Sequence, residues 1–192
     1  PRIGAKYPLG SATVTILGLN AGSDANNTSI VLKVQYGATS FLFTGDAERE
    51  AEQAILNSGV NLSATVLKVG HHGSDTSTTY PFLREIMPKY AVISVGKGNS
   101  YGHPEDNPLS RLRDADVTVY RTDLNGDIVF TSDGRSVSVS VAKQASYESI
   151  MTPGGAVVVV TTVTTPAKTT KSTNTTTKTE PSSTTTTTKP SS

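Results

Sequence analysis

The sequence predicts an α/β fold, a layered sandwich of helices and mixed β-sheets. The first observation is the order of the elements, because a strand-rich opening precedes alternating strands and helices and then a closing hairpin. The second is the placement of turn residues, since Gly37-Ala38, Asn125-Gly126 and Asp133-Gly134 each separate two apolar runs. The third is that the 192-residue chain has no cysteine, which excludes disulfides and cysteine-based zinc sites.

The elements follow from hydrophobic periodicity and from turn and breaker residues. Residues 12–17 alternate like a strand, and residues 47–57 carry apolar positions at helical spacing, with Gly59 just past their end. A second helix is predicted to stop before Pro88. The further predicted strands are 29–36, 40–44, 64–69, 90–95, 117–120, 127–131 and 136–142, and the further helices are 78–87 and 108–114.

The C-terminal part of the sequence differs sharply in composition. Structure signals are weak after Ser146, so we expect a domain over residues 1–146 and a low-complexity Thr/Ser/Lys/Pro linker or tail over 147–192. From about Thr161 there is nothing to bury, and we expect this stretch to be disordered. The apolar run at 156–160 is too short to span a membrane.

Charge and the N-terminus exclude little. The net charge is +1, so the total gives no electrostatic argument for nucleic acid. No signal peptide or membrane span is visible, but the chain begins at Pro1 instead of Met. We therefore expect an N-terminal part to be missing, and the lack of a signal peptide indicates nothing.

Metal-competent side chains stand where predicted strands end. Asp46 follows one apolar run in Phe-Thr-Gly-Asp-Ala-Glu, and His71 and His72 follow another in Lys-Val-Gly-His-His-Gly-Ser. The remaining histidine, His103, lies in Asn-Ser-Tyr-Gly-His-Pro after a third run. Because these turns can converge on one edge of a sheet, we expect a hydrolytic metal site, whose oxygen and imidazole ligands favour zinc or manganese.

Each of these residues also has a purely structural interpretation. Asp46 could cap the following helix, and residues 74–77 could cap the next one, which we prefer to a functional role for them. Adjacent histidines point in different directions, so at most one of His71 and His72 is expected to bind metal directly. His103 precedes proline, which alone favours an extended backbone. A serine nucleophile is disfavoured because no Gly-x-Ser-x-Gly elbow is present.

Taken together, the motifs resemble a known family. Residues 26–126 are similar to the C-terminal half of the metallo-β-lactamase-like domain of ComEC-type competence DNA-uptake proteins, and the matching pieces occur in the family's order. These pieces are 27–32, 41–48, 67–74, 91–96, 99–104 and 119–123. The resemblance implies a partial αββα sandwich, its second half, with metals at one edge between the sheets.

The resemblance also implies roles for single residues. Asp46 matches the aspartate that bridges two metals, and His72 is the preferred metal ligand of the histidine pair. The metal would be zinc, one ion or two, with manganese as the alternative. His71 and His103 would be the catalytic residues, and Ser74, Asn99 and His103 would contact an ester or phosphodiester substrate, with DNA as one candidate.

One departure from the family limits these expectations. The principal metal motif, His-x-His-x-Asp-His, and the Asp-x-Gly strand before it are absent from this chain. Asp46 and His72 supply two side chains, whereas a catalytic zinc site normally has about three protein ligands and an open position. We therefore expect the parent protein to be a metal-dependent hydrolase and this chain alone to be inactive. The alternative is a non-catalytic binding or scaffolding module that keeps the fold.

The C-terminal composition indicates a setting. Threonine-rich segments with proline resemble linkers of secreted Gram-positive bacterial proteins, which lead to another module. We therefore expect an extracellular or cell-surface bacterial protein with a further module after the linker. The alternative is a cytoplasmic protein with a plain disordered C-terminus.

Overall fold

A computed structural model describes residues 1–22 and 24–154, so the part of the predicted 147–192 tail from residue 155 onward lies outside the described residues. The strands are β1 (Lys6–Leu9), β2 (Ala12–Gly18), β3 (Val31–Tyr36), β4 (Thr39–Phe43), β5 (Val66–Lys68), β6 (Tyr90–Ile93), β7 (Thr118–Arg121), β8 (Ile128–Ser132) and β9 (Val137–Val141). The helices are α1 (Arg49–Asn57), α2 (Tyr80–Ile86), α3 (Asp106–Asp114), α4 (Thr122–Asn125) and α5 (Tyr147–Ile150), with short 3-10 turns η1 (Asn26–Thr28) and η2 (Gly70–Gly73).

The main sheet is mixed, as the sequence predicts. Its seven strands lie in the order β1 to β7. Strands β1 to β4 pair antiparallel, and β4 to β7 pair parallel. The carboxyl ends of β4, β5 and β6 therefore lie at the same edge, which is where a parallel sheet usually presents functional loops. This topology brings the predicted metal ligands to one edge.

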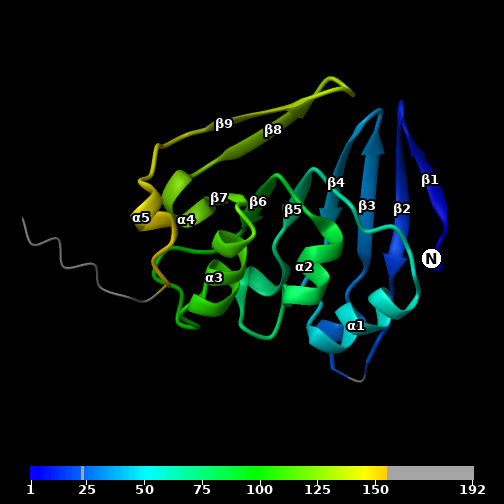
Figure 1. The fold of residues 1–192 in the computed structure, drawn as a ribbon, viewed down its shortest axis with the longest axis horizontal. Helices are drawn as coiled ribbons and strands as arrows, with labels where there is room; N and C mark the ends of the chain where they lie inside the picture. Colours follow the sequence, from blue (N-terminus) through cyan, green and yellow to red (C-terminus); the bar gives the residue numbers. More distant parts are fainter. Residues whose placement is uncertain (23, 155–192) are drawn as a thin grey trace, which may run out of the picture. The chain divides into compact units, whose positions relative to one another are not determined.

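Helices α1, α2 and α3 cover one face of the sheet (Figure 1). Helix α1 turns Ala51 and Ile55 inward, four residues apart on one helical face, and both are buried. On this face the residues of β4 to β7 are almost fully buried, as alternation predicts for a covered sheet, whereas those of β1 to β3 are exposed or half-buried apart from Leu17 and Val31. The core includes Leu42, Leu67, Phe82, Ala91, Ile93, Leu109 and Leu112.

The opposite face is partly covered by the β8–β9 hairpin (Figure 1). The ring of Phe130 lies 5.7 Å from the rings of both Tyr90 and Tyr120, which point out of β6 and β7 on this side. Near the hairpin tip, the hydroxyls of Ser132 and Thr39 are 2.6 Å apart. The predicted hairpin is thus present, and it forms a short second layer over the sheet.

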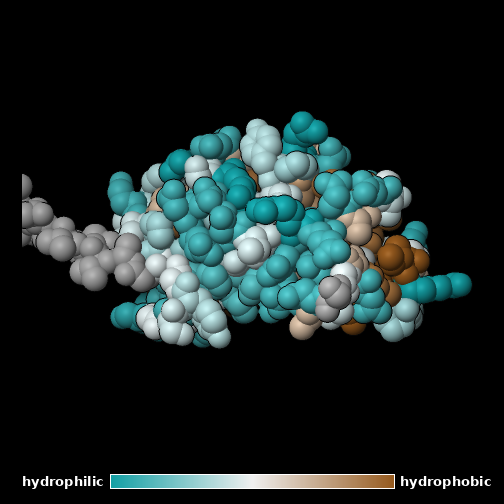
Figure 2. Space-filling model, turned by 90° about the horizontal axis from the view of Figure 1, so that it is seen from below, coloured by the Kyte–Doolittle hydropathy of each residue, from teal (hydrophilic) through white to brown (hydrophobic). Residues whose placement is uncertain are grey.

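The hairpin leaves part of this face open. Tyr7 pairs across the sheet with Val14, then Val34 and then Phe41, so all four side chains share the hairpin side. Tyr7 is 46% exposed on this side, and the nearby Leu9 is 59% exposed. Figure 2 shows the molecule from below the view of Figure 1, the side away from the hairpin, where the surface is mostly hydrophilic with hydrophobic residues gathered toward the β1 end. The exposed apolar side chains on the hairpin side are of the kind that normally packs against another layer.

The helix starts differ from the capping interpretations. Helix α1 begins at Arg49 after Glu48, and no side chain of the N-cap residue bonds to the helix, so Asp46 does not cap it. Helix α2 begins at Tyr80 after Thr79, so residues 74–77 do not cap that helix. Instead, the buried Glu52 of α1 accepts hydrogen bonds from the backbone N–H of Thr78 and, at 2.8 Å, of Thr79. A carboxylate from a neighbouring helix therefore holds the two residues that lead into α2.

The C-terminal end of the described chain is packed. Beyond Ser146 the chain forms α5, whose Ile150 is 9% exposed and joins the hydrophobic core. The buried Arg121 of β7 donates a hydrogen bond to the carbonyl oxygen of Ile150 at 2.9 Å. Helix α5 has four residues, and a helix that short is not stable alone. Tertiary contacts hold it, which is why local sequence signals did not predict it.

Glu52→Ala is expected to destabilise the fold by about 2–4 kcal/mol, because the buried N–H of Thr78 and the partly buried N–H of Thr79 would lose their acceptor. Glu52 is 1% exposed, and burial raises the pKa of its carboxyl group. Urea unfolding at neutral pH measures the loss. Glu50→Ala, on the exposed side of the same helix, is the control and should change stability by about 0.5 kcal/mol or less. Equal unfolding midpoints for the two variants would show that Glu52 does not anchor α2.

Candidate functional site

Asp46 is presented by a tight turn after β4. Gly45 has φ 57°, a left-handed conformation that favours glycine, and a Cβ there would lie 3.0 Å from Oγ of Ser29. The same Ser29 hydroxyl accepts a hydrogen bond from the backbone N–H of Asp46 at 3.1 Å. Thr44, buried before the turn, donates its hydroxyl to the carbonyl oxygen of Lys68 on β5 at 2.9 Å. These contacts fix the backbone position from which the Asp46 side chain extends.

The histidine turn after β5 has an unusual backbone. His71 and His72 both have positive φ, 44° and 55°, in the left-handed region that bulky residues rarely adopt. The backbone N–H of His71 donates to the carbonyl oxygen of Gly45 at 3.1 Å, which ties this turn to the Asp46 turn. The hydroxyl of Ser77 holds the carbonyl oxygen of Gly70 at 2.8 Å. Backbone strain at adjacent residues marks a candidate functional site.

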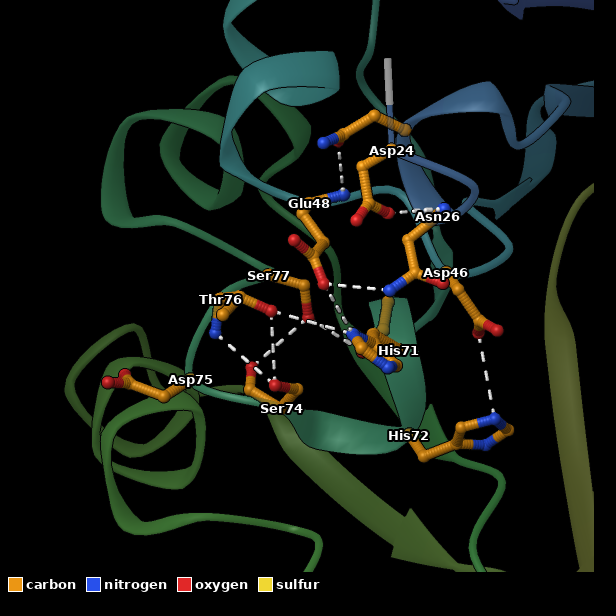
Figure 3. Close-up of polar contacts among 12 residues, drawn as sticks. Asp24, Asn26, Asp46, Glu48, His71, His72, Ser74, Asp75, Thr76 and Ser77 are labelled. Carbon is orange, nitrogen blue, oxygen red and sulfur yellow. Dashed lines mark hydrogen bonds and ion pairs between the residues drawn. The ribbon is translucent and has the colours of Figure 1, made fainter. Parts of the chain in front are cut away.

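His72 faces Asp46 across the edge of the sheet. Its Nε2 lies 3.6 Å from Oδ1 of Asp46 (Figure 3). Its Nδ1 lies 2.6 Å from the carbonyl oxygen of Ser94, and because a carbonyl only accepts, Nδ1 carries the proton. Nε2 is therefore the nitrogen that is free to bind a ligand. A ring anchored through Nδ1 to a carbonyl is a common arrangement for a metal-binding histidine.

Lys68 lies on the hairpin side of β5 beside this pair. Its Nζ donates to the carbonyl oxygen of Val69 at 2.7 Å. Burial lowers the pKa of Lys68, and the nearby Asp46 carboxylate partly opposes that shift. With Phe43, Val92 and other side chains, Lys68 lines a cavity of about 300 Å³ between the sheet and the hairpin. The site thus has a cationic group on an otherwise apolar wall.

His71 points away from the Asp46–His72 pair and toward Glu48 (Figure 3). Its Nδ1 lies 3.0 Å from Oε1 of Glu48, and the two side chains are 24% and 21% exposed. The same carboxylate oxygen accepts a hydrogen bond from Nδ2 of Asn26 at 2.9 Å. Glu48 therefore orients the His71 ring. Its position two residues after Asp46, in Asp-Ala-Glu, is the sequence signal that could have indicated this role.

His103 completes a cluster of the three histidines. Its ring lies 5.6 Å from that of His71 and stacks on Tyr101 at 5.7 Å. Nδ1 of His103 is buried without a hydrogen-bond partner among the described residues, and Oε1 of Glu105 is 3.6 Å away, beyond hydrogen-bond distance. Burial lowers the pKa of His103, while Glu105 partly opposes this. The ring therefore favours its neutral form and has a free nitrogen.

The two other predicted substrate contacts are engaged elsewhere in the protein. Asn99 accepts from the backbone N–H of His103 at 3.0 Å and donates to its carbonyl oxygen at 2.7 Å, so its amide shapes the His103 loop. Ser74 is buried, and its hydroxyl lies 3.1 Å from that of Thr76 and 3.5 Å from Oε1 of Glu105. These geometries give both residues structural contacts close to the histidines.

The donor set for a metal is small. Asp46 and His72 face each other, but no group of three or more His, Cys, Asp or Glu side chains suited to one metal ion occurs within residues 1–22 and 24–154. The nitrogen and oxygen donors match what zinc and manganese accept. The pair can therefore supply two ligands, and further donors would have to be added to complete a metal site.

A mixed sheet backed by helices, with Asp and His ligand candidates at the ends of its parallel strands, defines a half-sandwich of the metallo-β-lactamase type. Comparison with known families agrees: the model of the metallo-beta-lactamase superfamily matches residues 5–97, which confirms the predicted resemblance over this part of the chain. The match includes Asp46, His71 and His72 and ends before His103. It also starts earlier than residue 26, where the motif resemblance begins.

Competence and recombination proteins are similar to more than half of the chain. ComE operon protein 3 of Bacillus subtilis is 45% identical over 116 residues, which are 60% of this chain and 15% of that protein. Competence protein ComA of Neisseria gonorrhoeae is 41% identical over 108 residues, which are 56% of this chain and 16% of that protein. Recombination protein 2 of Haemophilus influenzae is 37% identical over 103 residues, which are 54% of this chain and 13% of that protein. The chain thus corresponds to a small part of each relative.

The predicted resemblance to ComEC-type competence proteins is thereby confirmed. Among the described residues, no helix is both long and apolar enough to cross a membrane.

Proposed function

We propose that this chain supplies one half of the active site of a metal-dependent hydrolase that cleaves phosphodiesters or related esters. The observation that carries the proposal is the Asp46–His72 pair, with 3.6 Å between Oδ1 and Nε2 and with the His72 ring anchored on Ser94. The remaining ligands would come from a strand layer that covers the open side of the sheet. Two donors and an uncovered apolar face support this division of the site.

The residues present fit zinc, with manganese as the alternative. Asp46 would bridge two ions or hold one, and Nε2 of His72 would hold one, because its other nitrogen is engaged. When bound, such ions lower the pKa of a water molecule toward neutrality. The chain contributes a fixed carboxylate and a fixed imidazole to that chemistry.

The other two histidines would act on the substrate. Glu48 holds the Nδ1 proton of His71, which leaves Nε2 of His71 free to hold or move a proton. His103 would donate the N–H of its neutral ring to a substrate oxygen, or would first take up a proton and then protonate the leaving group. Ser74 and Asn99 would support the substrate side through the loops that they order.

The proposed substrate class is supported by the relatives, and the proposed cellular location is supported by the composition of the sequence. Relatives named for competence and recombination make DNA one candidate phosphodiester. A bacterial extracellular or cell-surface location, with a further module after the Thr/Ser/Lys/Pro segment, fits the composition of residues 147–192. A cytoplasmic location is the alternative. These assignments rest on analogy and composition, whereas the metal pair rests on geometry.

The test is hydrolysis of bis-p-nitrophenyl phosphate and of DNA, with zinc or manganese and with a chelator. Two proteins are compared: this chain, and the chain extended by whatever residues the gene encodes before Pro1. We expect chelator-sensitive turnover by the extended protein only. Turnover by this chain alone would overturn the divided site. An extended protein that is inactive with every metal and ester would favour the non-catalytic binding or scaffolding role.

Glu48→Ala is expected to lower kcat of the extended protein by about 10- to 100-fold, the usual effect of losing a residue that orients a catalytic or metal-binding imidazole. Glu48→Gln should retain more activity, because its amide oxygen can still accept the Nδ1 proton of His71. Steady-state kinetics with saturating metal measure both. The exposed Glu50→Ala is the control. If Glu48→Ala and Glu50→Ala have equal kcat, Glu48 has no role in orienting His71.

A further inference from the structure

The chain returns to the site at its described C-terminal end. We call residues 150–154 the C-terminal strap. At one end of the strap, Arg121 donates through Nη1 to the carbonyl oxygens of Ile150, at 2.9 Å, and Thr152. Arg121 is 3% exposed and is itself held by Asp123, at 3.1 and 2.7 Å. A buried guanidinium with a paired carboxylate is a rigid anchor.

At its other end the strap meets the His103 loop. The backbone N–H of Gly154 donates to the carbonyl oxygen of Pro104 at 2.7 Å. A Cβ at Gly154 would lie 1.8 Å from the carbonyl oxygen of His103 and 2.3 Å from its carbonyl carbon. Only glycine fits there without moving one of the two backbones. The strap thus touches the residue that carries the unpaired imidazole.

The same loop is joined to the histidine turn. The backbone N–H of Glu105 donates to the carbonyl oxygen of Gly73 at 2.9 Å. A Cβ at Gly73 would lie 2.6 Å from Cβ of Pro104, so the two segments are in close contact. The ring of His103 in turn lies 5.6 Å from that of His71. Contacts therefore run without a gap from the strap, through the His103 loop, to the turn that carries His71 and His72.

We propose that the C-terminal strap positions His103, with Arg121 and Gly154 as its positioning residues. The strap contacts the backbone of His103 from outside the loop, while the side chain of Asn99 hydrogen-bonds to the same backbone from within the loop. A change in the strap therefore moves the His103 imidazole relative to His71. This links the site to the segment that leads into the Thr/Ser/Lys/Pro stretch. The catalytic consequence rests on the proposed function, but the positioning itself does not.

Positioning is measured by NMR of the histidine rings in the full chain, whose three histidines give three Cε1–Hε1 signals. Gly154→Ala should shift or broaden the His103 signal well beyond those of His71 and His72. The control is Gly96→Ala, at the start of the same loop, where a Cβ has no atom within 4 Å and φ is not positive. A His103 signal in Gly154→Ala that matches the parent chain would overturn the proposal.

A second variant covers the case in which Gly154→Ala fails to fold. Arg121→Lys keeps the charge but cannot make the paired contacts of a guanidinium, so it loosens the strap at its far end. We expect faster protease cleavage within residues 150–154, together with a smaller shift of the His103 signal. Faster cleavage with an unchanged His103 signal would show that the strap and His103 are independent.

Activity gives a separate readout in the extended protein. Gly154→Ala should lower kcat by about 10-fold, the lower range for the loss of a supporting contact, with little change in KM. In a His103→Ala background it should have no further effect, whereas a general loss of folding would persist there. If Gly154→Ala shifts the His103 signal but the extended protein without substitutions shows no turnover, the strap still positions His103 and the proposed hydrolase function is refuted. Full turnover of Gly154→Ala despite a shifted signal would refute the catalytic consequence alone.

Discussion

Asp46→Ala and His72→Ala are each expected to lower metal-dependent hydrolysis by the extended protein by about 10²-fold or more, since losing even a supporting partner of a ligand can cost that much. The two side chains face each other, with 3.6 Å between Oδ1 of Asp46 and Nε2 of His72, which is close enough for both to bind one ion. Each variant removes one donor from a site that normally needs about three. Zinc affinity should fall in parallel with kcat.

Titration calorimetry with zinc and steady-state kinetics measure these two effects. Asp75→Ala is the matched control, because this carboxylate lies on the far side of the histidine turn (Figure 3) and pairs with Arg111 at 3.1 Å. That partly exposed ion pair contributes little to stability, so activity and affinity should remain near the parent values. Zinc affinity that is unchanged in both Asp46→Ala and His72→Ala would remove the pair from the metal site.

The second large effect concerns the open side of the sheet. Alone, the chain is expected to self-associate, because Tyr7, Leu9 and Phe43 expose 46%, 59% and 42% of their surfaces on the hairpin side. It is also expected to remain inactive, because Asp46 and His72 are fewer ligands than a catalytic zinc site normally has. A covering strand layer would bury these side chains and bring further ligands to Asp46 and His72. Activity should then change from none to measurable turnover.

Sedimentation velocity over a range of concentrations measures the self-association. A Tyr7→Lys, Leu9→Lys double variant should reduce it, since charged residues at an exposed sheet surface oppose pairing. Tyr80→Lys is the control: Tyr80 is 57% exposed but lies on α2, on the other side of the sheet. A chain that stays monomeric at high concentration would show that this face does not need a partner layer.

Much of the fold was predictable from local pattern. The strand before Asp46, the strand before the histidine turn and the helices α1 to α3 follow from alternation, helical spacing and turn residues. Strand β1 was missed because Lys6–Leu9 is exposed along its whole length, so no buried periodicity marks it. Helices α4 and α5 have four residues each, too few for a periodic signal, and α5 is held by the core and by Arg121.

The sequence by itself determined which residues could bind a metal and that they stand at strand ends. Asp46, His71, His72 and His103 were identifiable because glycine turns and apolar runs are local features of the chain. Only the tertiary structure decided their partners. Which histidine faces Asp46, and which is held by Glu48, depends on left-handed backbone angles at two adjacent residues. The contact of Gly154 with His103 depends on packing between segments far apart in the sequence, and no local pattern encodes that packing.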